Sequence, residues 1–175
     1  TKFLCEDRYK EYGVQVVYGD TDSVFVHLPK KLCWADNEKD YIDKANVIGE
    51  EMASMCTKAF LPPNDLEFEK VYYPLLLKGK KRYAGYKFEL GLKPNLDVKG
   101  FECVRRDFAP LVSKTQKEVL IRMVQKRDTE SAVQYARQKV QDLLDGNVPV
   151  SELIISKQLT RPVDQYKTPA PHVEL

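Results

Sequence analysis

The sequence predicts an α+β protein, with an antiparallel β-sheet and a packed helix in its first part and helices in its second. Two observations predict this fold class. β-rich runs and strand-like alternation dominate most of the first hundred residues, and apolar stripes at helical spacing dominate the rest. The pattern changes near Lys99-Gly100, so we expect a first domain at 1–100 and a second at 101–175. A chain of 175 residues, 43% hydrophobic and 31% charged, is typical of a globular protein of one domain or two small lobes.

Two β-rich runs come first in the predicted sheet. Residues 14–18 (VQVVY) and 23–28 (SVFVHL) are separated by the short polar stretch Gly19-Asp20-Thr21-Asp22. Two such runs joined by a few turn-forming residues predict a β-hairpin.

A helix and two further strands are expected next. Residues 39–60 carry apolar side chains every three or four positions, and Pro62-Pro63 ends that pattern, which predicts an amphipathic helix. Residues 66–73 alternate, which predicts a strand with Leu66 and Phe68 inward and Glu67 and Glu69 outward. Residues 82–90 predict another strand. The helix stripe consists of Tyr41, Ala45, Ile48, Met52, Met55 and Ala59.

The second part predicts helices. We expect Asp107 to cap a first helix and Thr129 to cap a second, which Gly146-Asn147 ends. Residues 151–155 predict a last short helix, and the proline-containing stretch after it predicts a loop. The core-facing stripes are expected to be Phe108, Leu111, Val112, Thr115, Val119 and Met123 in the first helix, and Val133, Ala136, Val140, Leu143 and Leu144 in the second.

The composition argues against several classes of protein. No apolar run approaches the ~20 residues that span a membrane, so we expect no membrane partner. The chain has four cysteines without a Cys-x-x-Cys pair and only two histidines, which disfavours a zinc site and fits a reducing compartment. Its start has no initiating Met and no signal core, which suggests a segment of a longer protein.

The charge is strongly uneven along the chain. The net charge is +2, but residues 70–127 carry 15 basic and five acidic side chains, whereas residues 1–69 carry eight basic and 14 acidic ones. A basic block of this kind predicts a surface that faces a polyanion, although a solvated basic surface has the same composition.

Two carboxylates lie at the tip of the predicted hairpin. Asp20 and Asp22 are two residues apart, and in a strand that spacing projects both side chains to one side, with Thr21 pointing away. Two adjacent carboxylates repel each other unless a cation lies between them, and oxygen ligands suit Mg²⁺ or Mn²⁺. An Asp-x-Asp pair alone is more often a turn, but apolar strands on both sides would hold this tip rigidly.

Tyr18-Gly19-Asp20-Thr21-Asp22-Ser23 between two apolar strands resembles the third polymerase motif of family B DNA polymerases. The resemblance implies that Asp20 and Asp22 are catalytic residues that ligate metal ions. Leu66-Glu67-Phe68-Glu69-Lys70-Val71-Tyr72 also resembles the family, which makes Glu69 an auxiliary metal ligand or a solvent-facing strand acid.

Basic segments carry the rest of the resemblance. Lys80-Lys81-Arg82-Tyr83 resembles the family's Lys-Lys-Arg-Tyr motif, where the palm meets the primer–template end. Arg105, in Lys99-Gly100-Phe101-Glu102-Cys103-Val104-Arg105, matches a basic minor-groove position at the palm-to-thumb junction. The resemblance therefore implies DNA binding by Lys80, Lys81, Arg82, Tyr83 and Arg105. This interpretation requires Asp20 and Asp22 to lie together and to be open to Lys80 and Lys81.

The likeness runs from about Val14 to the segment 171–175, and is strongest to delta-type cellular polymerases and those of large DNA viruses. It implies a palm at 1–100 and a thumb at 101–175. The implied reaction is template-directed DNA synthesis, with Mg²⁺ (or Mn²⁺) as cofactor. The implied partners are primer–template DNA, deoxynucleoside triphosphates, the remainder of the polymerase chain and a processivity factor, and the implied location is the nucleus or a viral replication site.

Three family motifs are not found: the first polymerase motif with its further aspartate, the fingers motif that holds the triphosphate, and any exonuclease motif. We therefore expect the chain alone to be inactive. A non-catalytic nucleic-acid-binding module remains an alternative, and would bind DNA without responding to divalent ions. Another two-metal enzyme, such as a nuclease, would need further carboxylates near Asp20, for which Glu67 and Glu69 are candidates.

Overall fold

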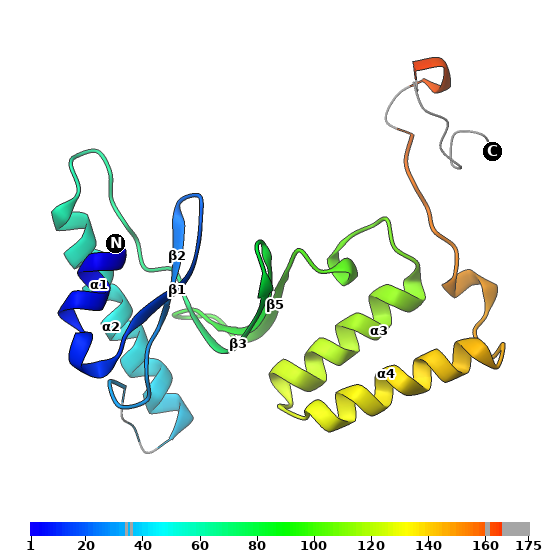
Figure 1. The fold of residues 1–175 in the computed structure, drawn as a ribbon, viewed down its shortest axis with the longest axis horizontal. Helices are drawn as coiled ribbons and strands as arrows, with labels where there is room; N and C mark the ends of the chain where they lie inside the picture. The colour runs from blue at the N-terminus through cyan, green and yellow to red at the C-terminus, as the bar shows by residue number, and fades with distance from the viewer. Residues whose placement is uncertain (34, 36, 160–161, 166–175) are drawn as a thin grey trace. The chain divides into compact units, whose positions relative to one another are not determined.

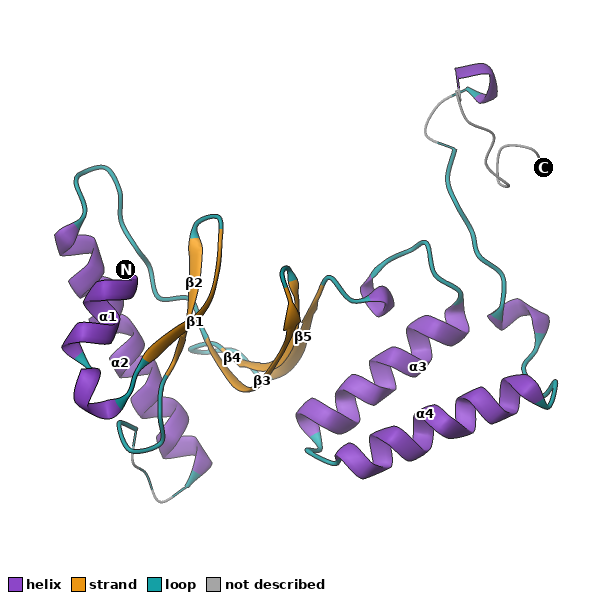
Figure 2. Ribbon diagram, in the orientation of Figure 1, coloured by secondary structure: helices purple, strands orange, loops and turns teal. Residues whose placement is uncertain are grey.

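The structure, a computed structural model, describes residues 1–33, 35, 37–159 and 162–165. These fold into two units, Thr1–Lys81 with Gly85–Asp97 and Arg82–Ala84 with Val98–Leu175. Both small β-sheets and helices are present, which confirms the predicted α+β class (Figures 1 and 2). The division of the chain into a palm and a thumb stays a prediction.

The predicted hairpin is present. Strand β1 (Gln15–Asp20) pairs antiparallel with β2 (Ser23–His27), and Asp20 pairs with Ser23 at its closed end. The register shifts between Val16 and Tyr18, so Val17 is an extra residue in β1. The turn therefore contains only Thr21 and Asp22.

The long helix is also present, as α2 (Glu38–Ala59). Asn37 caps its start by accepting a hydrogen bond from the Asp40 N–H (3.0 Å), and Phe60 is already extended, just before the two prolines. A short N-terminal helix, α1 (Lys2–Arg8), was not predicted. Figure 1 shows α1 beside α2, and a small core of Cys5, Val14, Met52 and Cys56 forms where they meet β1.

The buried stripe of α2 is slightly rotated from the predicted one. Ala45 and Met52 are buried as expected, but Ala59 is exposed, and Ile42 and Cys56 are buried although the predicted stripe omits them. The predicted apolar spacing therefore holds in the middle of the helix and fails at its last turn.

The second sheet differs from the prediction in where its strands begin and end. It has the order β3–β4–β5, with β3 at Val71–Gly79, β4 at Arg82–Phe88 and β5 at Asn95–Lys99. The strand predicted over 66–73 is wrong in its first five residues, which alternate in burial as predicted but pair with no strand. Pro74 lies inside β3, which is tolerated because β3 is at the edge of this sheet.

Stability of the first unit should depend on pH through Cys5. Burial, followed by the nearby Cys56 thiol (Sγ–Sγ 3.8 Å), raises the pKa of Cys5 to about 12. Between the ordinary thiol pKa of 9.0 and about 12, the folded chain keeps a proton on Cys5 that the unfolded chain loses. The contribution of the buried Cys5 thiol to the free energy of unfolding is therefore complete below pH 9.0 and is lost as the pH rises toward 12.

We therefore expect the free energy of unfolding to fall between about pH 8 and about pH 11, and to fall less in a Cys5→Ala variant. Urea unfolding of both chains at the two pH values measures the difference. Equal pH slopes in the two proteins would contradict this assignment.

The second unit contains two antiparallel helices, α3 (Pro110–Leu120) and α4 (Thr129–Leu144), which lie side by side in Figure 1. A π-helical turn, Ile121–Gln125, extends α3. Leu120, Val124 and Ala132 are the most buried residues of this pair of helices and the turn between them. At the end of α4, Gly146 is left-handed, and the N–H groups of Gly146 and Asn147 donate to earlier carbonyls, so Gly146-Asn147 ends the helix as predicted.

Both predicted helix caps are wrong. The α3 helix begins at Pro110, after Ala109, and the Asp107 carboxylate instead pairs with Arg105 (Nη2–Oδ2 2.7 Å). In α4 the cap is Asp128, which accepts from the Ser131 N–H (2.9 Å), so Thr129 is the first helical residue. For α3, Arg105 takes the Asp107 carboxylate that was expected to cap the helix. For α4, the neighbouring Asp128 makes the capping hydrogen bond in place of Thr129.

Part of the predicted core of α4 is exposed. Val140 is 58% exposed and Leu144 is 74% exposed, and Val133 and Leu143 are exposed as well. Ala132 is buried, and the ring of the partly buried Tyr135 lies under the guanidinium of Arg122 in the π-helical turn (4.7 Å). The predicted core stripe of α4 is only partly buried, because α4 carries more apolar side chains than one neighbouring helix can cover.

Short 3₁₀ helices complete the fold at Lys10–Tyr12, Glu102–Val104, Val150–Glu152 and Val163–Gln165. The predicted helix over 151–155 is thus a single turn that starts one residue earlier. Residues 171–175, which carried part of the family resemblance, lie outside the described residues. Across the described part of the chain, none of the helices is both long and apolar enough to cross a lipid bilayer.

Candidate functional site

The β1–β2 turn places Asp20 and Asp22. Asp20 is the last residue of β1, and Thr21 has a left-handed backbone (φ 51°), which is unusual for a β-branched residue. The Ser23 hydroxyl donates to the Asp20 carbonyl across the turn (3.1 Å). Asp22 therefore lies in the turn and not in a strand, so strand alternation does not set the direction of its side chain. The expectation that both carboxylates project to one side stays a prediction.

A second tight turn places Lys80 and Lys81. It joins β3 to β4, and Lys81 also has a left-handed backbone (φ 58°). Both lysines are exposed, so the turn offers two positive charges to the solvent. The strand β4 begins at Arg82, directly after the two lysines, which is where the predicted strand over 82–90 begins.

The two turns meet through Lys81. Its backbone N–H donates to the Tyr18 hydroxyl (2.8 Å), and its Nζ lies 3.5 Å from Oδ1 of Asp20. Tyr18 and Asp20 are two residues apart on β1, so their side chains share one face of the strand and both reach the same turn. The Asp20 side chain is 26% exposed and the Lys81 side chain 64% exposed. Asp20 is therefore open to the basic turn, as required. The same requirement for Asp22, and the requirement that the two carboxylates lie together, stay predictions.

Aromatic side chains support the hairpin. The Phe25 ring contacts Tyr18 (5.4 Å between centroids) and stacks on Tyr72 of β3 (5.8 Å, 14° between planes). The Tyr72 hydroxyl donates to Oδ2 of Asp97 on β5 (2.5 Å). Sequence reasoning did not identify Tyr18 as a contact of the lysine turn. Its place two residues before Asp20 on the strand was the available signal.

Glu69 is not brought together with the aspartates. It lies on the irregular segment before β3, is exposed, and pairs with Lys70 (3.0 Å). Among the residues that the structure describes, no three His, Cys, Asp or Glu side chains are close enough to hold a metal ion. A role for Glu69 as an auxiliary ligand stays a prediction.

The remaining predicted DNA contacts belong to the second unit and already have internal partners. Arg82 forms an ion pair with Glu102 and lies over the Phe101 ring (5.4 Å). Arg105 pairs with Asp107 and lies over Phe108 (5.4 Å).

The charges of both pairs are mutually stabilised. The hydrogen bond from the Gln116 amide lowers the pKa of Glu102 most, and a backbone hydrogen bond and the Arg82 guanidinium lower it further. The hydrogen bond from Arg105 lowers the pKa of Asp107. Arg82 therefore has a clear structural role in the second unit, and its role in DNA binding, like those of Tyr83 and Arg105, stays a prediction.

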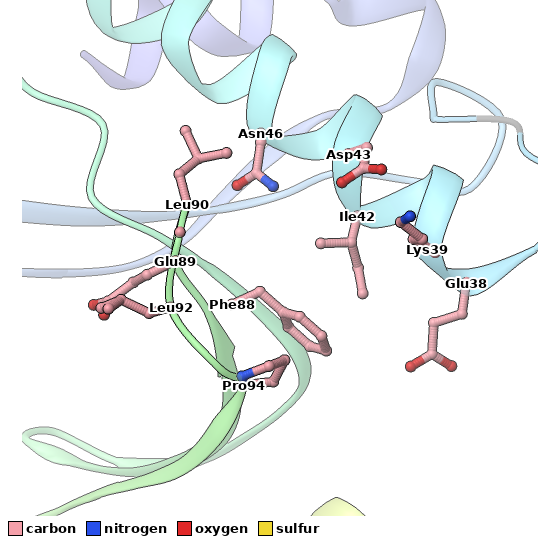
Figure 3. A pocket seen from close by; sticks show the side chains of 11 residues that line it. Glu38, Lys39, Ile42, Asp43, Asn46, Phe88, Glu89, Leu90, Leu92 and Pro94 are labelled. Carbon is pink, nitrogen blue, oxygen red and sulfur yellow. The ribbon is translucent and has the colours of Figure 1, made fainter.

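A pocket in the first unit lies apart from the predicted site residues (Figure 3). It is formed by the first turns of α2 and by the loop after β4, and contains the nearly buried Asn46, whose Oδ1 has no hydrogen-bond partner among the described residues. Ile42, Phe88 and Pro94 make its walls apolar. None of the residues predicted from the sequence to bind metal or DNA lines it.

Comparisons with known proteins agree with the motifs. Residues 2–175 match the family described as DNA polymerase family B. The chain is 43% identical over 184 residues to the DNA polymerase delta catalytic subunit of Caenorhabditis elegans, covering all of this chain and 16% of that protein. It is 39% identical over 177 residues to the one of Plasmodium falciparum, covering 99% of this chain and 15% of that protein. The chain thus spans about a sixth of the curated relatives it matches, and it belongs to DNA polymerase family B.

Proposed function

We propose that this chain is the part of a replicative DNA polymerase that carries two of the metal-binding carboxylates and the adjoining basic turn. The activity of the whole enzyme is template-directed DNA synthesis from deoxynucleoside triphosphates. The observation that carries the proposal is the contact between the two turns, where Asp20 lies 3.5 Å from Lys81. A carboxylate for a metal ion and a lysine for nucleic acid are thereby held in one place.

Asp20 and Asp22 would hold Mg²⁺, or Mn²⁺ in its place. Carboxylate oxygens suit these ions, and Asp20 already has a cationic group, the Lys81 ammonium, beside it. When bound, two such ions activate the primer 3′-hydroxyl and stabilise charge on the transferring phosphorus. The two aspartates supply negative charge on a rigid turn, and a further aspartate from outside this chain completes the ligand set.

The basic turn would contact the primer–template duplex. Lys80 and Lys81 reach solvent from a two-residue turn, which suits contact with phosphates and with the minor groove. Minor-groove acceptors are present on every base pair, so such contacts sense the geometry of a pair rather than its sequence. We assign Arg82, Tyr83 and Arg105 to the same duplex on the strength of the family motifs.

The first unit would then be part of the palm and the second the start of the thumb. The partners are primer–template DNA, deoxynucleoside triphosphates, the rest of the polymerase and a processivity factor. As a replicative enzyme, the polymerase would act in the nucleus, or at a replication site if it is viral.

Primer extension tests this function. We expect the complete polymerase to extend a primed template when Mg²⁺ is present, and the 175-residue chain alone to give no extension, because it lacks the third aspartate and the triphosphate-binding motif. Template-directed synthesis by the isolated chain would contradict the proposal that the third aspartate and the triphosphate-binding motif come from the rest of the polymerase. DNA binding by the complete enzyme without any extension would favour the non-catalytic alternative.

A further inference from the structure

The Lys81 side chain has two roles that exclude each other. Its ammonium lies 3.5 Å from Oδ1 of Asp20, an oxygen that a metal ion bound by this carboxylate would also use. A divalent cation on Asp20 would repel the ammonium at that distance. The same ammonium is the group that would bind nucleic acid. We therefore expect a metal ion on Asp20 to weaken or break this contact of Lys81.

The backbone of the turn is fixed independently of the lysine side chain. The Lys81 N–H donates to the Tyr18 hydroxyl (2.8 Å), and the residue is held at φ 58° between two paired strands. A lysine has a long, flexible aliphatic stem, so its ammonium can move while its Cα stays in place. Its side chain is 64% exposed, so no packed neighbour blocks that movement.

We propose that Lys81 is a tethered counterion of Asp20, which a divalent cation displaces and thereby frees to bind nucleic acid. The inference rests on the proposed metal-binding role of Asp20. It adds that the metal ion and the lysine compete for one carboxylate, and that metal binding strengthens the contact of Lys81 with DNA. Tyr18 is the positioning residue, because its hydroxyl keeps the lysine turn beside Asp20 whether or not the ammonium is paired.

Neighbouring Lys80 offers a matched control. It carries the same charge in the same turn, but among the described residues it forms no ion pair. Replacing either lysine with glutamine removes one positive charge from the vicinity of the aspartates. Only the replacement of Lys81 also removes the contact with Asp20, so the difference between the two variants isolates the competition.

The first experiment measures Mn²⁺ binding to the complete polymerase without DNA, followed by electron paramagnetic resonance of free Mn²⁺. We expect Lys81→Gln to bind Mn²⁺ about two- to fivefold more tightly than Lys80→Gln, the range set by the strength of an exposed ion pair. Equal Mn²⁺ affinity in the two variants would overturn the proposal.

An Asp20→Asn variant tests the metal-binding role of Asp20 separately from the counterion role of Lys81. If it binds Mn²⁺ as tightly as the unaltered enzyme, the metal assignment of Asp20 in the proposed function fails. If it loses Mn²⁺ binding while Lys81→Gln and Lys80→Gln bind alike, the proposed function stands and the counterion role of Lys81 is wrong.

The second experiment measures DNA affinity at several salt concentrations, with and without Ca²⁺, which occupies carboxylate sites and here replaces the catalytic ion. Coupling is reciprocal, so an ion that releases Lys81 must add a DNA contact. We expect Ca²⁺ to make the decrease of DNA affinity with salt steeper in both variants. The increase should be larger in Lys80→Gln than in Lys81→Gln, by about the slope of one phosphate contact. The same change in both variants would overturn the proposal.

Discussion

Replacing Asp22 with asparagine in the complete polymerase should lower the rate of primer extension on the order of 10²–10³-fold, the loss typical when one group that stabilises transition-state charge is removed. The amide keeps the size of the carboxylate but removes the negative charge that would hold a divalent ion. Asp22 is exposed in the β1–β2 turn, and its side chain makes no ion pair or hydrogen bond with another described residue. The substitution should therefore leave the fold unchanged.

Affinity for primer–template DNA should change by no more than about twofold, because Asp22 offers no contact to a phosphate. Single-turnover extension and a separate DNA-binding titration measure the two quantities. Asp65→Asn is a suitable control, since Asp65 is also an exposed carboxylate of the first unit but lies in the loop before β3. Near-normal extension by the Asp22 variant would show that this carboxylate is not a metal ligand.

Asp22 is a cleaner test than Asp20 because the two carboxylates have different neighbours. Asp20 pairs with Lys81, and its loss would free a positive charge beside the DNA as well as remove a ligand. A change at Asp20 therefore combines two opposing effects on DNA affinity. The two carboxylates differ in their neighbours because Asp20 is the last residue of β1, whereas Asp22 lies in the turn that follows.

Local patterns in the sequence were sufficient to predict the hairpin and the long helix. Both depend on contacts between near neighbours: the strands 15–20 and 23–27 are joined by two residues, and α2 has its own cap and a buried stripe. The strand predicted over 66–73 failed because burial alternates before Val71, but hydrogen-bonded pairing begins only there. Alternation reports which side chains are covered, whereas a strand also needs a partner.

The site could be predicted as a set of residues but not as an arrangement. The hexapeptide at 18–23 pointed to Asp20 and Asp22, and the basic run at 80–83 pointed to Lys81. The direct contact between Asp20 and Lys81 spans 61 residues, and the Tyr18 hydroxyl holds the Lys81 backbone by a second contact. No local periodicity encodes either contact. The left-handed backbones of Thr21 and Lys81 were also unpredictable, because neither residue type favours that conformation.

Gly49 gives the second large effect, in the stability of the first unit. It lies within α2, where replacing glycine by alanine ordinarily stabilises a helix by about 0.5–1 kcal/mol. Here a Cβ on residue 49 would lie 2.3 Å from Cε2 and 2.4 Å from Cδ2 of the Phe68 ring. We therefore expect Gly49→Ala to destabilise the first unit by roughly 1–3 kcal/mol, as overpacking does, because the clash outweighs the gain in helix propensity.

The sign of the effect should reverse when the ring is removed. In a Phe68→Ala background the three atoms nearest to the added methyl group, all in the Phe68 ring, are gone, and Gly49→Ala should then stabilise the chain by about 0.5–1 kcal/mol. Chemical unfolding of the four proteins of this double-mutant cycle, followed by circular dichroism, measures both signs. If Gly49→Ala were equally unfavourable with and without the ring, the glycine would be required by the helix backbone itself. If it were favourable in both, the segment that carries Phe68 would be free to move off α2, and the approach of β3 to the helix would not depend on this contact.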